Sequence, residues 1–559
     1  MSARGPETTA DTTPDRMPET MSDQAQQSDE AAATGDATSL PMDRDSGTLP
    51  ELVRAQAARH GDRVAVRDGA TDVTFAALAA AVDECARAWM ALGIARGDRV
   101  AVWAPNSARW QVAALGAQAA GAILVPLNTR WKGREVAEVL VRAGVRALVT
   151  VNGFLGLDYV AMLRSCDVPT PMLTHIIIAD GAAPADTLDW PPFLAGAGRV
   201  SAAEAEARSR AVTSDDLSDL IFTAGTTGQS KGVACTHGQS LRVFRTWSEV
   251  VGLRASDRYL VVNPYFHTFG YKAGWLACLL TGATCLPHPV FDVPSLLARI
   301  AAERVTVLPG PPTLYQSILH APDRARYDLS SLRLAVTGAA SVPVELIRRM
   351  REELTFGTVL TAYGLTESTG TVTMCRRDDD VETIANTSGR AIPGVEVRID
   401  EAAGGEVLVR GYNVMRGYWE DDAATRAAID ADGWLRTGDV GILDARGNLR
   451  ITDRIKDMFI VGGFNVYPAE VENILLRHEA IAQAAVVGAP DERLGEVGCA
   501  FVVLRPNTKA TADELAGWAR EQMAHYKAPR RVHLVDALPL NAVGKVLKYQ
   551  LREIARQTQ

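Results

Sequence analysis

Residues 223–232 read Thr-Ala-Gly-Thr-Thr-Gly-Gln-Ser-Lys-Gly, and the interpretation of the whole sequence starts from this stretch. It follows the apolar run Leu220-Ile221-Phe222, which predicts the end of a buried strand. Glycines let backbone N–H groups close around an anion, and Lys231 adds a compact positive charge. A Walker-type loop is excluded because Lys231 is followed by Gly232 rather than by Ser or Thr. The stretch predicts a phosphate-binding loop, with a flexible surface turn as the alternative.

The composition is that of an ordinary globular protein and excludes several classes of function. The 559 residues are too many for one core, so two or more domains are expected. The formal net charge of -9 gives no basic footprint for nucleic acid, and no apolar run approaches membrane-spanning length. The seven cysteines are scattered singly without metal-ligand spacing, which favours reduced thiols and a cytoplasmic location. We therefore expect no nucleic-acid partner and no integral membrane association.

Residues 1–48 differ in composition from the rest of the sequence. They are rich in Thr, Ser, Asp, Glu and Gln and contain few large apolar residues, so they cannot bury enough surface to fold. We expect a disordered tail or a mis-assigned start, with Met17, Met21 and Met42 as alternative starts. Deletion of residues 1–45 should leave the melting temperature and the turnover essentially unchanged.

From residue 49 onward, helix-like and strand-like stretches alternate, which predicts parallel α/β layers. Over 396–452 the strand-like runs are short and closely spaced, which predicts a β-rich subdomain. The stretch 181–215 is expected to be a surface excursion. The helix and strand pairs are 75–92 with 99–103, 111–120 with 123–125, 135–143 with 147–150, and 294–303 with 305–308.

After Asp453 the pattern restarts as a small α+β unit whose first helix begins at Pro468. The predicted fold class is thus α/β, with a large N-terminal domain that includes the β-rich subdomain and a small mobile α+β C-terminal domain. The expected boundaries are a tail at 1–48, the N-terminal domain at 49–453, a hinge at 454–456 and the C-terminal domain at 457–559.

Four further clusters place polar side chains in turns or at strand ends. Three of them have an ordinary alternative: Tyr363 as a core residue, Asp439 as a helix cap and Lys545 as a solvated charge. The clusters are Thr-Ala-Tyr-Gly-Leu-Thr-Glu at 361–367, Gly-Trp-Leu-Arg-Thr-Gly-Asp at 433–439, Asp-Arg-Ile-Lys-Asp at 453–457 just before Gly462-Gly463, and Pro-Leu-Asn-Ala-Val-Gly-Lys at 539–545.

Together with the loop at 223–232, and in this order, the clusters resemble the adenylate-forming superfamily of acyl-CoA synthetases, peptide-synthetase adenylation domains and luciferases. The resemblance covers residues 50–555. Two positions depart from the usual loop, since Ala224 replaces a common serine and Ser230 a common proline. The resemblance implies an enzyme that uses ATP, Mg²⁺ and coenzyme A. A carboxylate first forms acyl-AMP with release of pyrophosphate, and a thiol then displaces AMP.

The resemblance also implies roles for individual residues, with Lys545, Thr366, Glu367 and His267 as the catalytic set. Glu367 would hold Mg²⁺, Thr366 would contact the α-phosphate, and Lys545 would span the carboxylate and the α-phosphate. Tyr363 would lie against adenine, and Asp439, assisted by Arg454, would accept hydrogen bonds from the ribose. The loop residues that would hold the β- and γ-phosphates are Thr223, Ala224, Gly225, Thr226, Thr227, Gly228 and Lys231, and the nucleotide set also includes Ala339, Thr361, Ala362 and Gly364.

A domain rotation is implied as well. In the superfamily the small domain turns between the two steps about a hinge two residues after the arginine, which is Lys456 here. The rotation would bring Gly462 and Gly463 to the site, where the missing side chains let the pantetheine arm pass.

The segment 263–270, Asn-Pro-Tyr-Phe-His-Thr-Phe-Gly, resembles the gate before the acyl pocket and would place His267 near the carboxylate, with a core or capping histidine as the alternative. No aspartate occurs between Phe266 and Gly274, which disfavours a free amino acid as substrate. The stretches 270–274, 308–313, 338–343 and 463–468 are similar to actinobacterial ligases that charge with CoA the methylhydrindane propanoate left from sterol rings C and D. A steroid-derived bicyclic propanoate or a fatty acid is therefore the expected substrate.

Two other functions are open at this stage. One is a stand-alone adenylation protein that loads a carrier protein, and the other is a non-enzymatic nucleotide-binding protein, which would be expected to lose Lys545 or Glu367. We also expect Lys545 to be a target for a lysine acetyltransferase and a deacetylase, since acetylation removes the charge that adenylation needs.

Overall fold

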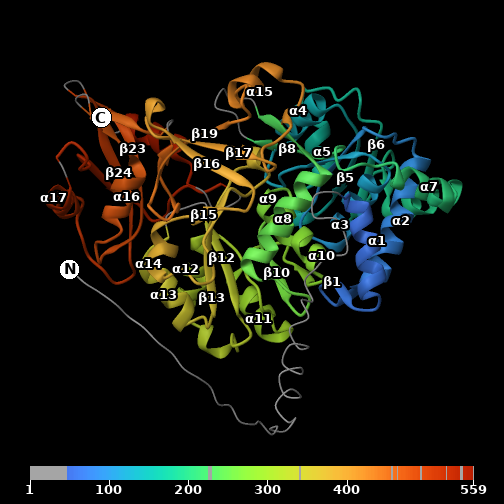
Figure 1. Ribbon diagram of the computed structural model, residues 1–559, viewed down its shortest axis with the longest axis horizontal. Helices are drawn as coiled ribbons and strands as arrows, with labels where there is room; N and C mark the ends of the chain where they lie inside the picture. Colours follow the sequence, from blue (N-terminus) through green and yellow to red (C-terminus); the bar gives the residue numbers. More distant parts are fainter. Residues whose placement is uncertain are drawn as a thin grey trace, which may run out of the picture. The chain divides into compact units, whose positions relative to one another are not determined.

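The strand that precedes the predicted loop belongs to an eight-stranded sheet (Figure 1). The computed structural model describes residues 47–223, 230–338, 342–454, 457–461, 464–491, 494–523, 525–541 and 546–557. In spatial order the strands of this sheet are β18 (Gly417–Tyr418), β9 (Lys231–Thr236), β8 (Leu217–Thr223), β4 (Ile123–Pro126), β3 (Arg99–Trp103), β5 (Val145–Val151), β6 (His175–Asp180) and β7 (Leu188–Asp189).

Strands β8, β4, β3, β5, β6 and β7 pair in parallel, whereas β9 is antiparallel both to β8 and to β18. Parallel strands that are covered on both faces carry continuous apolar runs, and β4 is buried along its whole length. The alternation of helices and strands is confirmed here. The helices of this half are α1 (Leu49–His60), α2 (Phe75–Ala91), α3 (Ala108–Ala119), α4 (Gly133–Ala143), α5 (Tyr159–Arg164), α6 (Trp190–Ala195), α7 (Ala202–Arg210) and α8 (His237–Val251).

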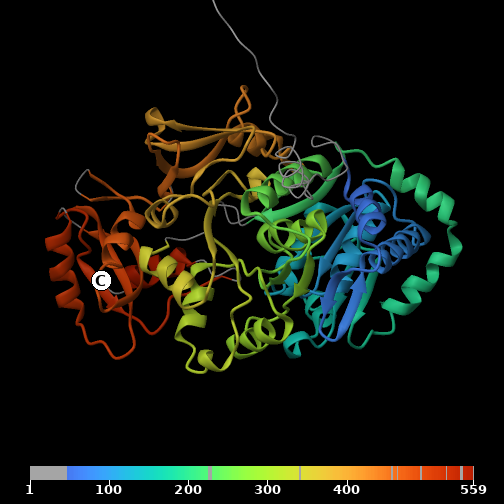
Figure 2. The same ribbon diagram turned by 60° about the horizontal axis from the view of Figure 1, so that its bottom comes forward.

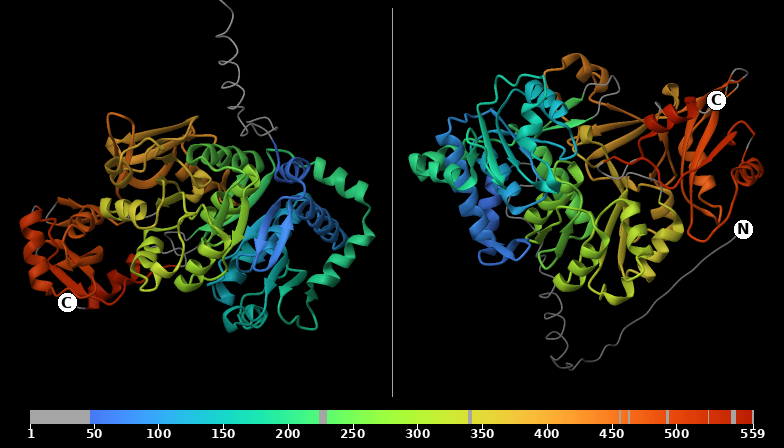
Figure 3. Two further views of the ribbon diagram at one scale, coloured as in Figure 1. Left: turned by 90° about the horizontal axis from the view of Figure 1, so that it is seen from below. Right: turned by 180° about the vertical axis from the view of Figure 1, so that it is seen from behind.

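The expected surface excursion at 181–215 is exposed over most of its length, as predicted, and it contains β7, α6 and α7 (Figure 3). Ser201 caps α7 by accepting the backbone N–H of Glu204, and the alanines and arginines that follow are good helix formers. Both helices pack against α2. The Pro, Asp and Ala content of the stretch concealed a capped helix.

Two four-stranded sheets continue the α/β part. The strand expected at 305–308 is reduced to isolated bridges at Val307, with Tyr259 on one side and Leu334 on the other. The chain continues alongside β12, because the backbone N–H groups of Leu308 and Gly310 donate to the carbonyls of Leu334 and Val336, each at 3.0 Å. The strands are β10 (Arg258–Val261), β11 (Thr284–Pro287), β1 (Val64–Asp68) and β2 (Thr71–Thr74) in one sheet, and β12 (Leu334–Gly338), β13 (Thr358–Tyr363), β14 (Thr373–Met374) and β15 (Arg390–Ala391) in the other.

The helices beside these sheets include a π-helical segment that directly follows the predicted acyl gate. Such segments are uncommon and often mark functional sites. The elements are α9 (Thr268–Gly270), the π-helix η3 (Tyr271–Leu276), α10 (Ala277–Thr281), α11 (Val293–Glu303), α12 (Pro312–His320), α13 (Val344–Glu352), the 3₁₀ turn η5 (Thr366–Ser368) and α14 (Val381–Asn386).

The β-rich subdomain is confirmed as a four-stranded antiparallel sheet, drawn in orange in Figure 2. Its strands in spatial order are β16 (Val395–Asp400), β17 (Glu406–Gly411), β19 (Leu435–Leu443) and β20 (Leu449–Arg454), with α15 (Asp422–Ala428) between β18 and β19 in the chain.

The last hundred residues form a smaller α+β unit with a five-stranded sheet. Successive residues of a strand point to opposite faces, so Val486 joins one apolar cluster and Val487 the other. Among the described residues, no helix combines the length and the apolar character needed to cross a membrane. The elements are β21 (Phe459–Val461), β22 (Phe464–Val466), α16 (Pro468–Leu475), β23 (Ile481–Asp491), β24 (Gly495–Leu504), α17 (Ala512–Gln522), β25 (Arg531–Leu534) and α18 (Lys548–Gln557).

Candidate active site

The β8–β9 hairpin fixes both ends of the predicted phosphate loop. Thr223 and Lys231 are paired directly across the hairpin, and Phe222 is paired with Gly232. A Cβ atom at position 232 would lie 2.9 Å from the Phe222 ring, so a side chain there would displace the ring. The loop residues Ala224, Gly225, Thr226, Thr227 and Gly228 lie outside the described residues, and their roles stay predictions.

Lys231 and Glu367, which are far apart in sequence, meet at Tyr418. The Lys231 Nζ atom lies 4.8 Å from the centroid of the Tyr418 ring, and the Tyr418 hydroxyl donates to Glu367 Oε1 at 3.0 Å. Burial, and then the charge of Glu367, raise the pKa of Tyr418, so its hydroxyl keeps the proton that it donates. The structure thus joins a cation, an aromatic ring and a carboxylate in one cluster.

Tyr418 was not found from the sequence. It reaches the cluster because β18 pairs with β9, which sets Tyr418 opposite Val233. The backbone N–H of Trp419 also donates to the backbone carbonyl of Gly232 at 2.7 Å, which extends the pairing toward the loop. The only sequence signal was the Gly-Tyr-Trp run at 417–419, and short antiparallel pairing between distant segments leaves no periodic pattern.

The turn that carries Thr366 and Glu367 is held by the side chain of Ser368. The Ser368 hydroxyl lies 3.1 Å from the Leu365 N–H and 2.9 Å from the Leu365 carbonyl. A Cβ atom on Gly364 would lie 2.2 Å from the carbonyl oxygen of Gly370, so only glycine fits there. Met415 N–H donates to the carbonyl of Glu367 at 2.9 Å, which fastens the turn to the segment before β18.

The residues predicted for adenine and ribose are in direct contact. The Tyr363 hydroxyl donates to Asp439 Oδ2 at 2.6 Å, and Asp439 is buried. The backbone of Arg454 pairs with Asp439 across β19 and β20. Two strands of different sheets therefore bring together an aromatic ring and a hydrogen-bond acceptor, and their roles toward adenine and ribose stay predictions.

The other residues of β13 have contacts within the protein. The Thr361 hydroxyl lies 2.9 Å from the carbonyl oxygens of both Ile384 and Thr387. Ala362 is paired with Gly338 on one side and Met374 on the other. Their place in the nucleotide set stays a prediction.

His267 caps the short helix α9. Its Nδ1 atom accepts the N–H of Phe269 at 3.2 Å, which is the capping role that the sequence left open. Gly270 follows in a tight turn, since a Cβ atom there would lie 2.2 Å from the carbonyl oxygen of Pro264. Whether Nε2 of His267 also faces the substrate carboxylate stays a prediction.

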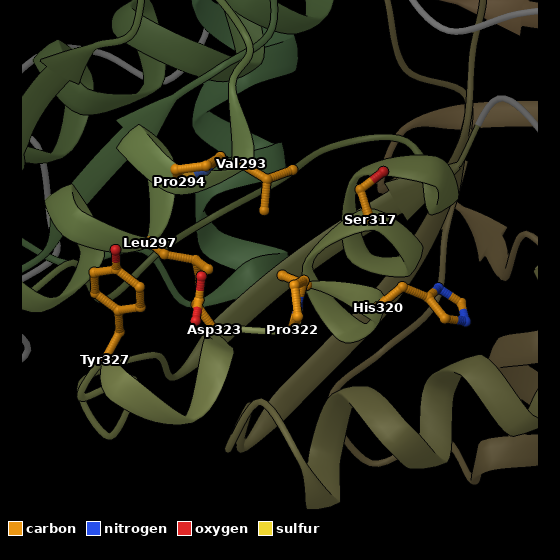
Figure 4. Close-up of a pocket in the computed structure, with 9 residues that line it drawn as sticks. Val293, Pro294, Leu297, Ser317, His320, Pro322, Asp323 and Tyr327 are labelled. Carbon is orange, nitrogen blue, oxygen red and sulfur yellow. The ribbon is translucent and has the colours of Figure 1, made fainter.

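The remaining predicted residues, Ala339, Lys456, Gly462, Gly463 and Lys545, lie outside the described residues. A pocket of about 240 Å³ lies elsewhere, between α11 and α12 (Figure 4). Its wall includes Leu297 and His320, and none of the predicted site residues lines it.

Glu367 is suited to the Mg²⁺ that the sequence predicts. Across the described ranges, no three His, Cys, Asp or Glu side chains gather as a protein-only metal cage. Mg²⁺ bound to nucleotides is usually held by one or two carboxylates with phosphate and water oxygens, so the single carboxylate of Glu367, joined through Tyr418 to Lys231, fits such an ion.

Comparisons with known proteins agree with this geometry. A model of the AMP-binding enzyme family matches residues 53–419, and a model of the AMP-binding enzyme C-terminal domain matches residues 470–545. The chain belongs to the AMP-binding enzyme family.

Two curated relatives of this AMP-binding enzyme are (7a-methyl-1,5-dioxo-octahydro-1H-inden-4-yl)propanoyl:CoA ligases. The chain is 52% identical over 510 residues to the one from Rhodococcus jostii, which covers 90% of this chain and 98% of that protein. It is 51% identical over 514 residues to the one from Mycobacterium tuberculosis, which covers 92% of this chain and 100% of that protein.

Among solved structures, an anthranilate CoA ligase in complex with anthranoyl-AMP has a TM-score of 0.82 and 27% sequence identity, covering 94% of this chain and 99% of that one. The fold class and the superfamily predicted from the sequence are confirmed. The protein is an ATP-dependent acid–thiol ligase, and ATP and CoA are the co-substrates that this family uses.

The cluster around Tyr418 gives a test of the site. We expect Tyr418→Phe to lower kcat/KM for MgATP in pyrophosphate release by about 10-fold, because a hydrogen bond to a charged group contributes about 1.5–3 kcal/mol. The Mg²⁺ concentration at half-maximal rate should rise as well, because Glu367 loses the donor that orients its carboxylate.

Tyr412→Phe is the matched control, since the Tyr412 hydroxyl lies 3.3 Å from Thr246 Oγ1 rather than at Glu367. It should retain wild-type kinetics. If Tyr418→Phe keeps the MgATP kinetics and the Mg²⁺ dependence of the wild type, Tyr418 has no role in the site.

Proposed function

We propose that this ligase charges with CoA a bicyclic propanoate of the methyl-dioxo-hydrindane type, as remains from rings C and D of a steroid in a catabolic pathway. The observation that carries the proposal is identity above 50%, over nine-tenths of the chain, to two ligases named for that acid. The medium-chain acyl-CoA ligases among the relatives share only 33% identity with this chain. A fatty acid is the second candidate, supported by the fold shared with a fatty acyl CoA synthetase of Mycobacterium tuberculosis at a TM-score of 0.72.

In the first step, a carboxylate oxygen of the acid attacks the α-phosphorus of ATP, the bond to the bridging oxygen breaks, and pyrophosphate leaves. The protein must bring anions together and stabilise the charge that develops, which is a matter of positioning and electrostatics. Lys231, fixed at the end of the hairpin, would offset the charge of the β- and γ-phosphates. Tyr363 and Asp439 would hold adenine and ribose.

Glu367 would hold the Mg²⁺, and the hydroxyl of Tyr418 would orient its carboxylate. When bound, the metal neutralises phosphate charge. Thr366, one residue before Glu367 in the same turn, would contact the α-phosphate. The roles given to the side chains of Lys545 and Arg454, at the α-phosphate and the ribose, come from the sequence resemblance alone.

In the second step, the CoA thiol loses its proton, sulfur bonds to the acyl carbon, and AMP leaves with the electrons of the broken acyl–phosphate bond. The named relatives use CoA, which favours CoA over a carrier-protein arm as the acceptor. We place the enzyme in the cytoplasm, where ATP and CoA are available; all seven of its cysteines are free thiols.

A substrate screen tests the proposal. Pyrophosphate release should be measured for the hydrindane propanoate, octanoate and benzoate, with CoA, with a phosphopantetheinyl carrier protein, and without a thiol. We expect kcat/KM for the bicyclic acid to exceed that for octanoate by about 100-fold or more. A pocket complementary to a rigid bicyclic ring system makes fewer favourable contacts with a flexible acyl chain. Mass spectrometry should detect the CoA thioester.

A preference for octanoate would replace the substrate assignment with a fatty acid. Transfer to the carrier protein in preference to CoA would show that a carrier protein, and not CoA, is the acceptor.

The two half-reactions should separate by mutation. We expect Lys545→Ala to lose acyl-AMP formation by about 100-fold or more, because removal of a charge that stabilises a transition state costs about 3–4 kcal/mol. It should still transfer supplied acyl-AMP to CoA, whereas Gly463→Leu should show the opposite pattern.

Lys548→Ala is a matched control, because Lys548 pairs with Glu472 at 2.9 Å within the small unit. Near wild-type adenylation by Lys545→Ala would refute the assignment. Acetylation of Lys545 by an acetyltransferase, reversed by a deacetylase, also stays a prediction, and the comparisons lend it no support.

A further inference from the structure

An ion pair lies fully buried beside the candidate site, between Lys272 of η3 and Asp219 of β8. The Lys272 Nζ and Asp219 Oδ1 atoms are 2.9 Å apart, and neither side chain is exposed to solvent. The two atoms are close enough for an ion pair, but their angles do not satisfy those of a hydrogen bond. Burying two charges is expensive, and a pair of well-packed apolar residues is often at least as stable. Stability alone therefore does not account for this pair.

The charges are supported by neighbours on β8 and β9. The Ser218 hydroxyl donates to Asp219 Oδ2 at 2.6 Å, and Cys235 is paired with Asp219 across the hairpin. Burial by itself lowers the pKa of Lys272, but the charge of Asp219 opposes burial, and the pKa lies above its ordinary value. The ammonium form of Lys272 is therefore favoured beside Asp219.

The position of the pair relates it to the site. Asp219 lies four residues before Thr223, at the start of the strand that leads into the phosphate loop. Lys272 lies five residues after His267, just beyond the predicted acyl gate. The pair therefore connects the strand that would position ATP with the segment that would position the acid.

A second connection joins the same two segments. The Gln118 amide of α3 donates to the carbonyl of Ser218 at 3.0 Å and lies 3.0 Å from the Tyr271 hydroxyl. Tyr271 stacks on Trp275 with ring centroids 4.8 Å apart, which fixes the π-helix that presents Lys272. Side chains of three elements thus hold η3 against β8.

The segment that carries Glu367 also approaches this cluster. Cys235 Sγ lies 3.7 Å from the hydroxyl of Thr369, two residues after Glu367. A Cβ atom on Gly370 would lie 3.3 Å from Cβ of Thr268, so the turn after Glu367 packs closely on the acyl gate. The buried cluster is in contact with all three segments that the reaction would need.

We propose that Lys272 and Asp219 are positioning residues that hold the predicted acyl gate, 263–270, at a fixed distance from Thr223 at the end of β8, and so set the distance between the attacking carboxylate and the α-phosphorus. The proposal rests on the proposed role of 263–270 in binding the acid. It goes beyond that role by naming the contact that fixes the segment. Misplacement of a reacting group by about 1 Å can cost about 100-fold in rate, so a buried pair of this kind has kinetic consequences.

The test separates stability from positioning. Lys272→Met alone should lower Tm by about 5 °C or more, because Asp219 is left as an unpaired buried charge. The double variant Lys272→Met/Asp219→Asn removes both charges and should recover most of this loss. We expect the double variant to lose about 100-fold in kcat/KM for the acid while KM for MgATP changes by less than about 3-fold.

The matched control is Arg333→Met/Asp257→Asn, which removes an ion pair whose Asp257 side chain is also buried, at the start of β10. It should leave acid kinetics within about 3-fold of wild type. All assays use the acid that the wild-type enzyme adenylates fastest, so failure of the hydrindane propanoate in the substrate screen does not count against this proposal.

A double variant with recovered Tm and wild-type acid kinetics would overturn the proposal, as would an equal loss in the control pair. If the double variant does not fold, Gln118→Leu decides, since it removes the second connection without leaving a buried charge. A lowered kcat and kcat/KM for the acid with unchanged KM for MgATP supports positioning, and unchanged acid kinetics overturns it.

Discussion

The antiparallel pairing of β8 with β9 is the constraint on which the rest of the site depends. A loop that binds phosphate through its backbone must have its ends held, because ordering a free loop costs conformational entropy with each substrate. The pairing of Thr223 with Lys231 meets that need within the framework of an eight-stranded sheet. The strand β18 pairs with β9 of the same hairpin and carries Tyr418. The hairpin therefore determines where Tyr418 lies, and the Tyr418 hydroxyl in turn binds Glu367.

Around this hairpin, each functional group is positioned by a different piece of chain. Tyr363 ends β13 and Asp439 lies on β19, yet their side chains meet at 2.6 Å. Lys272 and Asp219 join the π-helix to the strand before the loop. Precision of this kind suits a reaction whose catalysis consists mainly in bringing two anions together in the right orientation.

Local patterns in the sequence predicted much of the fold, and contacts between distant segments account for what was missed. Arg99–Trp103 and the helix at 75–92 carry clear periodicity, and both are present within a residue or so of their predicted limits. The helix α7 was not predicted because its composition also suits loops, and the strand expected at 305–308 is reduced to bridges at Val307. Tyr418 and the Lys272–Asp219 pair are defined by strand pairing and burial across more than fifty residues, which single-sequence periodicity does not report.

The most direct test of the account is a crystal structure with a non-hydrolysable acyl-AMP analogue, in which a sulfamate replaces the phosphate. The account predicts the adenine ring against Tyr363, a ribose hydroxyl within about 3.2 Å of the Asp439 carboxylate, and the sulfamate beside the β8–β9 loop and Thr366. The acyl group should lie beside the predicted acyl gate at 263–270. An adenylate bound away from Asp439 and the hairpin, with those residues unchanged, would contradict it.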